Sequence, residues 1–144
     1  MNKIFVKRTI LGAILGGFAG VLCFAGFSST PDMPSNFAQY QVWAWDNVMM
    51  WNTVVNRFAL GVMVALAGTI VWHPFGFRIS PWMRGAKIGF LMSLTLAIGA
   101  LMNQNAEVAR NSFAIVLVFG TIIGAVIDIL ITKFSGEGKD LLDK

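Results

Sequence analysis

Long, almost uninterrupted apolar runs separated by short polar segments dominate the pattern of this sequence. A helix that crosses the hydrocarbon core of a bilayer needs roughly 20 apolar residues, and four runs approach that length: about residues 9–27, 54–72, 85–102 and 113–132. The backbone finds no hydrogen-bond partner in lipid, so each run is expected to be helical. The period-2 alternation of a membrane barrel is not seen in these runs. The pattern predicts an all-α membrane protein, a four-transmembrane-helix bundle forming one domain over residues 1–144.

Basic residues are concentrated on one side of the four predicted spans. They precede the first span, lie in the second connection or follow the last span: Lys3, Lys7, Arg8, Arg78, Arg84, Lys87, Lys133, Lys139 and Lys144. Arg57 and Arg110 lie on the other side. Cytoplasmic segments carry an excess of Lys and Arg. We therefore expect both termini in the cytoplasm (N-in/C-in) and a location in the cytoplasmic, plasma or inner membrane.

The first apolar run also resembles a signal peptide, because it follows basic residues and contains small ones. The apolar core of a signal peptide is about 7–15 residues long, and the run at 9–27 exceeds that length. We expect it to be a retained membrane helix.

The segment between the first two spans combines helix breakers with aromatic side chains. Pro31 and Pro34 interrupt helix, and four aromatic residues follow: Tyr40, Trp43, Trp45 and Trp51. Amphipathic rings favour the headgroup layer. Two interpretations remain open, an interfacial aromatic segment along the outer leaflet, or an early start of the second span with Asp46 as its N-cap.

Small residues recur at every fourth position in three of the spans. In lipid, apolar side chains gain no free energy by contacting one another instead of the lipid tails. Helix association therefore depends on the van der Waals contacts that close backbone approach allows. The residues that would allow it are Gly12, Gly16 and Gly20 in the first span, Gly85, Gly89 and Ser93 in the third, and Gly120 and Gly124 in the fourth. These stripes predict tight packing, within the chain or between copies of it.

Two short similarities suggest an internal duplication. The segment 12–16 resembles 85–89, and the segment 56–59 resembles 111–114. Two helices per unit would give parallel repeats about an axis along the membrane normal. Chance similarity between short glycine-rich segments is an equal explanation.

Asp128 is the acidic residue placed deepest in the predicted spans. It follows Gly120 and Gly124 at the same spacing, so it shares their helix face and should point into protein. A charge inside a membrane is expensive and calls for a partner. We expect an ion pair with Arg84 or Lys87, with Lys87 preferred on depth. The pair would connect the third and fourth helices, or act as a proton or ion relay.

A second polar group is expected on the outer side, around Arg57. Its members are Asp46, Asn52, Asn56 and Arg57. They could form a site for an anionic lipid headgroup or for a carboxylate of a partner. Alternatively, Arg57 snorkels to the interface while the amides cap loops.

Composition narrows the class of protein. Apolar residues make up 56% and charged residues 12% of the chain, against about 25% charged residues in soluble domains, which excludes an ordinary soluble or disordered chain. The net charge of +4 comes without a basic patch or a nucleic-acid motif, so no nucleic acid is expected as a partner. One cysteine and one histidine offer no metal site, and no catalytic motif or cofactor loop is present.

These observations favour a non-enzymatic membrane protein. We expect an accessory, assembly or structural subunit that acts through helix packing and its outer aromatic segment. Its partners would be the lipid bilayer and other membrane proteins, or copies of itself. The alternative is a channel or transporter for a small solute or ion that works as an oligomer. A transport pathway usually places polar groups near the midplane, and the predicted spans offer only Ser93, Thr95 and Thr121 there.

Overall fold

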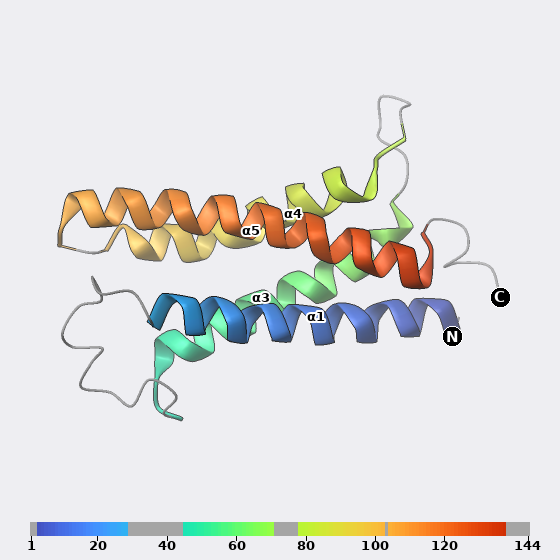
Figure 1. Cartoon of the computed structure of the whole chain (residues 1–144), viewed down its shortest axis with the longest axis horizontal. Coiled ribbons are helices and arrows are strands. Elements are labelled where there is room, and N and C mark those ends of the chain that lie inside the picture. Colours follow the sequence, from blue (N-terminus) through green and yellow to red (C-terminus); the bar gives the residue numbers. More distant parts are fainter. Residues whose placement is uncertain (1–2, 29–44, 71–77, 103, 138–144) are drawn as a thin grey trace.

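The computed structural model describes residues 3–28, 45–70, 78–102 and 104–137, and these are almost entirely helical (Figure 1). The elements are α1 (Lys3–Ser28), α3 (Val48–Leu66), a short 3-10 turn η1 (Ala67–Thr69), α4 (Pro81–Ala100) and α5 (Ala106–Ser135). No β-strand occurs in these ranges. The prediction of an all-helical protein is confirmed.

Three of the helical segments are long and apolar enough to cross a membrane. They are Lys3–Gly26, Val48–Thr69 and Ala106–Ser135. The remaining helix, α4, has 20 residues, which is a sufficient length. Arg84 and Lys87 in its first two turns lower its mean hydropathy, and α4 is not among the three.

The helix α3 begins at Val48, well before the start predicted near residue 54. Its N-cap is Asn47, whose side-chain oxygen accepts hydrogen bonds from the backbone N–H groups of Met49 and Met50, both at 3.1 Å. An early start of this span was one of the two interpretations left open by the sequence, and its cap is Asn47 and not Asp46. An N-cap side chain satisfies donors that have no partner within the helix. The early start places Arg57, which was expected near the beginning of the span, at the middle of the helix.

Of the outer aromatic segment, only the end lies within the described residues. Tyr40 and Trp43 fall outside them. Trp45 and Trp51 stack edge to face with ring centroids 4.9 Å apart, and the Trp51 indole nitrogen donates to the Trp45 carbonyl at 2.9 Å. This aromatic pair lies at the N-terminal end of α3.

The helices form two antiparallel pairs, α1 with α3 and α4 with α5 (Figure 1). In the first pair, a Cβ atom on Gly16 would lie 2.5 Å from the carbonyl oxygen of Arg57. In the second pair, a Cβ atom on Gly124 would lie 2.7 Å from the Cα atom of Gly89. Real Cβ atoms are not found so close to backbone, so these glycines are what allows the helices to touch.

The two pairs contain the same three-glycine contact. Gly61 of α3 lies against Gly12 and Gly16 of α1, while Gly124 of α5 lies against Gly85 and Gly89 of α4. In both cases a Cβ atom on the α3 or α5 glycine would meet the carbonyl oxygen of one partner glycine and the Cα atom of the other. The segments 12–16 and 85–89 thus occupy equivalent places.

The second similarity in the sequence does not occupy equivalent places. If Gly61 corresponds to Gly124, then Arg57 corresponds to Gly120 and not to Ser112. The equivalence that the structure shows is therefore one of glycine packing, with an arginine in one pair where the other has a glycine.

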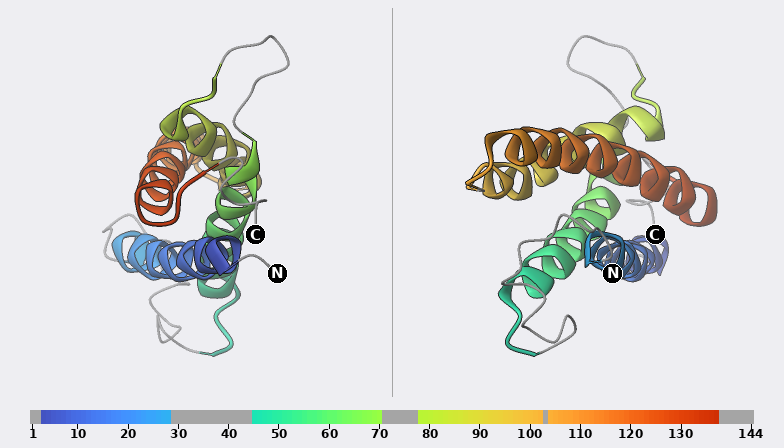
Figure 2. Two further views of the ribbon diagram at one scale, coloured as in Figure 1. Left: turned by 90° about the vertical axis from the view of Figure 1, so that its right-hand side faces the viewer. Right: turned by 60° about the vertical axis from the view of Figure 1, so that its left-hand side comes forward.

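The two pairs are inclined to each other (Figure 2). The right-hand panel looks nearly along α1, while α5 lies across the view. Where the pairs meet, the buried apolar core consists of Leu60, Val64, Ala65, Ile127 and Ile131. Large apolar side chains cover the outside of all four helices, including Phe18 of α1 and Phe119 of α5, which are 61% and 57% exposed.

Candidate functional site

The main concentration of charge lies where α1 and α4 begin and α5 ends. Its centre is Asp128 of α5, which is fully buried. Arg84, in the first turns of α4, donates from Nε to Asp128 Oδ2 at 2.7 Å and from Nη2 to Oδ1 at 3.0 Å. This bidentate geometry is the strongest that an arginine and a carboxylate can adopt. The contact of Gly85 with Gly124 brings the two helices close enough for it.

Arg8 of α1 approaches the same carboxylate from the other helix pair. Its Nη2 donates to Asp128 Oδ1 at 2.6 Å, and its side chain is fully buried. Its Nε donates to the Ala65 carbonyl at 2.9 Å, and its Nη1 donates to Thr132 Oγ1 at 3.1 Å and to the Gly136 carbonyl at 2.7 Å. One guanidinium therefore joins α1, α3 and α5.

The turn at the end of α5 brings a second carboxylate, that of Glu137, to the arginines around Asp128. Gly136 has a φ of 72°, a conformation that glycine adopts without the penalty of a Cβ atom. Glu137 then accepts hydrogen bonds from Arg84 Nη1 at 3.2 Å and from the exposed Arg78 at 2.8 Å. Arg84 Nη1 also donates to the Ile70 carbonyl at 3.0 Å.

We name Arg8, Arg84, Asp128, Thr132 and Glu137 the ionic cluster. It balances two arginines against two carboxylates. Asp128 accepts four hydrogen bonds, two from Arg84, one from Arg8 and one from Thr132 at 3.2 Å. An ionised carboxylate has about four acceptor positions. The cluster is thus saturated, and its charges are committed to holding helices together.

The structure places Arg84, and not the preferred Lys87, against Asp128. Lys87 is exposed. It is two residues from Gly85 and from Gly89, about 200° around the helix, so it lies on the side of α4 opposite the contact with α5. Depth along the helix suggested Lys87, but the position around the helix decides which residue reaches Asp128.

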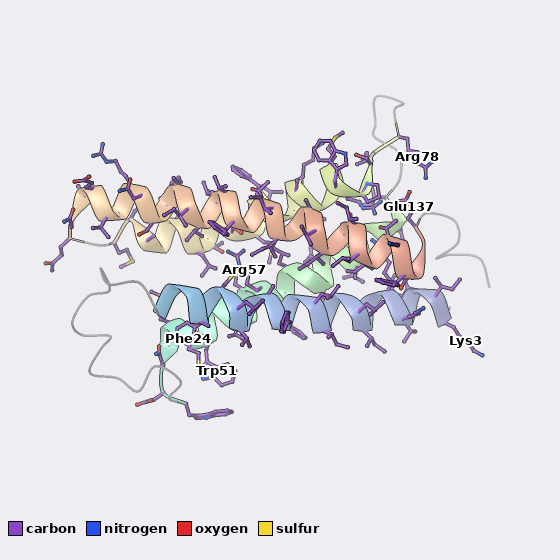
Figure 3. The ribbon with its side chains drawn as sticks, in the orientation of Figure 1. Lys3, Phe24, Trp51, Arg57, Arg78 and Glu137 are labelled. Carbon is purple, nitrogen blue, oxygen red and sulfur yellow. The ribbon has the colours of Figure 1, made fainter. Side chains whose placement is uncertain are left out.

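Arg57 is buried in the middle of α3 and lies between the two helix pairs (Figure 3). Its side chain is 3% exposed. Its Nη1 donates to Ser93 Oγ of α4, while its Nε is buried without a partner. No ion pair to Arg57 is present among the described residues. A Cβ atom on Gly120 of α5 would lie 2.9 Å from Nη1.

The other residues expected near Arg57 divide into two groups. Asn56 is close to it and donates from Nδ2 to the Met92 carbonyl at 3.0 Å and to Thr95 Oγ1 at 3.2 Å, while its Oδ1 is buried without a partner. Asn52 and Asp46 are exposed near the start of α3. The expected outer-face group is therefore not assembled, because the early start of α3 carries Arg57 into the interior instead of to the interface.

Three members of the ionic cluster, Arg8, Thr132 and Glu137, were missing from the sequence-based candidates. Thr132 follows Asp128 by four residues and so shares its helix face. Arg8 was counted only as a basic flanking residue, although it precedes Gly12 by four residues and thus belongs to the same helix face as Gly12, Gly16 and Gly20. That spacing was the available signal. Glu137 lies beyond the last helix, and no periodic pattern marks it.

No protein-family model, curated protein or solved structure matches this chain. Across the residues that the structure describes, no group of three or more His, Cys, Asp or Glu side chains could hold a metal ion. Two arrangements of charge remain as the candidate functional features of the molecule, the ionic cluster and Arg57.

Proposed function

We propose that the protein is an integral membrane protein in which all four long helices cross the bilayer and both termini lie in the cytoplasm. The support for α4 as a spanning helix is its close packing along α5 and its exposed apolar side chains, including Leu91 and Ile98, which are 64% and 55% exposed. The orientation is supported by the basic residues at the end where α1 begins and α5 ends.

Within that membrane we propose a non-enzymatic role, as an accessory, assembly or structural subunit. The observation that carries this proposal is the saturated ionic cluster. Its buried charges bond to one another and to carbonyl groups, so the cluster makes one rigid unit of both helix pairs. The outer surface is left apolar and suited to contact with lipid and with helices of other proteins.

The proposal can be tested by purification in a mild detergent followed by native mass measurement. We expect the tagged chain to be recovered in a stoichiometric assembly, either with another membrane protein or with copies of itself. Phe18→Ala or Phe119→Ala should weaken an assembly that uses these faces, without lowering the thermal stability of the isolated chain. Recovery of a monomer alone at every protein concentration would contradict the proposal.

A second candidate, an oligomeric channel or transporter for a small ion, is favoured by Arg57. Charged groups deep within membrane helices often mark ion pathways, and Arg57 lies at the middle of α3. Ion flux into liposomes that contain only the purified chain tests it. Robust flux that is lost in Arg57→Gln and retained in Arg110→Gln would favour the channel over the assembly subunit.

A further inference from the structure

Arg57 differs from the other two buried arginines because the described chain offers no negative charge to it. Arg8 bonds to Asp128, and Arg84 bonds to Asp128 and Glu137. Arg57 makes one side-chain hydrogen bond, to the neutral hydroxyl of Ser93. An arginine cannot relieve burial by losing its proton in a protein, so the positive charge of Arg57 persists.

The position of Arg57 in the molecule raises the free-energy cost of leaving its positive charge without a negative partner. It lies at the middle of α3, and its guanidinium is beside Gly120, near the middle of α5. Water is excluded from such a place more completely than at a helix end, and a buried charge without a partner is strongly unfavourable. Snorkelling does not relieve it, because the side chain is 3% exposed.

The polar groups around Arg57 favour a negative ligand. A guanidinium has five N–H donors, of which one is used here and Nε is buried without an acceptor. Its partner on α4, Ser93, is a neutral hydroxyl. The site therefore has a surplus of donors and positive charge.

Close helix packing around both the base and the tip of the Arg57 side chain limits the size of that ligand. A Cβ atom on Gly20 of α1 would lie 3.2 Å from the Arg57 Cβ atom, and one on Gly120 would lie 2.9 Å from Nη1. Such close approach of α5 to the guanidinium disfavours a ligand as large as a phosphate or a lipid headgroup, so the ligand that we consider is a small ion.

We propose that Arg57, held by Ser93 in the interior of the bundle, binds a small monatomic anion of the halide class. The anion supplies the charge that the described chain lacks and accepts from the unpartnered guanidinium donors. This inference goes beyond the assembly role and depends on neither proposed function. A bound halide fits a structural subunit as well as it fits an ion pathway.

The first test measures thermal unfolding in detergent while sodium gluconate is replaced by sodium chloride at constant ionic strength. A ligand that binds only the folded state raises the unfolding temperature, so we expect a rise of a few degrees for the wild-type chain. Arg57→Gln should lose this response, and Arg57→Lys should keep part of it because the charge remains. Arg110→Gln, at an exposed arginine of α5, is the matched control and should respond like the wild type.

A second measurement covers the case in which Arg57→Gln does not fold. Chlorine-35 magnetic resonance of the wild-type protein should show line broadening that bromide displaces. Absence of displaceable broadening, or a chloride response that survives in Arg57→Gln, would overturn the proposal. A chloride-insensitive protein that retains organic phosphorus through purification would also overturn it, and would assign the counter-charge to a lipid headgroup.

Discussion

Arg8 and Asp128 are separated by 120 residues in the sequence, and yet Arg8 Nη2 lies 2.6 Å from Asp128 Oδ1 with both side chains fully buried. This contact joins the first helix to the last. It also connects the two helix pairs, because α1 belongs to one pair and α5 to the other. Arg84 reaches the same carboxylate from α4. A single acidic side chain thus fixes the relative position of three helices.

Replacing Asp128 should destabilise the protein severely. Asp128→Asn preserves the size of the side chain but leaves two buried arginines facing a neutral amide. Removing one partner from a buried ion pair costs about 3–5 kcal/mol, so we expect a large fall in the unfolding temperature. Thermal unfolding in detergent, monitored by tryptophan fluorescence, measures it. Asp46→Asn, at an exposed position, is the control, and equal stability of the two variants would refute this account of the ionic cluster.

The glycine contact between α4 and α5 should not tolerate a methyl group. In Gly124→Ala the new Cβ atom would lie 2.7 Å from the Gly89 Cα atom, which forces the two backbones apart. Overpacking of this kind costs about 1–3 kcal/mol. Gly99→Ala, also in a helix but with nothing within 4 Å of its Cβ position, should be neutral or slightly stabilising. Comparison of the two unfolding temperatures checks the prediction, which is wrong if both variants behave alike.

The N-cap of α3 should contribute measurably to stability. Asn47→Ala removes the acceptor of the Met49 and Met50 backbone N–H groups, and loss of such a cap costs about 0.5–2 kcal/mol. Asp46→Ala, one residue earlier, should leave stability almost unchanged. If Asp46→Ala were instead the more damaging change, the assignment of the cap would have to be reversed.

The proposed orientation predicts which positions are accessible from outside the cell. Cys23 is the one cysteine of the chain, so a Cys23→Ser background allows single cysteines to be introduced. Gln104→Cys, between α4 and α5, should react with an impermeant thiol reagent in intact cells. Arg78→Cys, whose native side chain is 68% exposed at the opposite end, should react only after the membrane is permeabilised. The opposite labelling pattern would invert the orientation.

The fold could be predicted from the sequence to the extent that apolar runs define helices. Within the described residues, the predicted runs lie within four long helices and η1, except at residue 70, beyond the end of η1, and at residues 101–102, beyond the end of α4. Residues 71–72 of the second run lie outside the described part of the chain. Helix starts were less predictable, since polar residues within a helix, such as Asn52 and Thr53 of α3, interrupt an apolar run and hide the cap that lies before them. The start of α3 at Val48 shows the consequence, because a span predicted to begin near residue 54 placed Arg57 at a boundary instead of at the centre of its helix.

The partners of the charged residues were also only partly predictable from the sequence. Asp128 could be assigned to a protein-facing position because it continues the spacing of Gly120 and Gly124. Its partners could not be chosen from depth alone. Arg84 and Lys87 have similar depths, and the turn of the helix separates them. Arg57 and Arg8 each precede a glycine of a packing contact by four residues, Gly61 and Gly12, a regularity that identifies them as inward-facing.

The long separation between Arg8 and its acid also has a consequence for biogenesis. The ribosome synthesises the first helix complete with Arg8 before Asp128 exists, and at about 5–20 residues per second the delay is on the order of ten seconds. During that interval α1 is already synthesised, but Arg8 has no carboxylate with which to form an ion pair. Final docking of this helix therefore awaits the arrival of the last one.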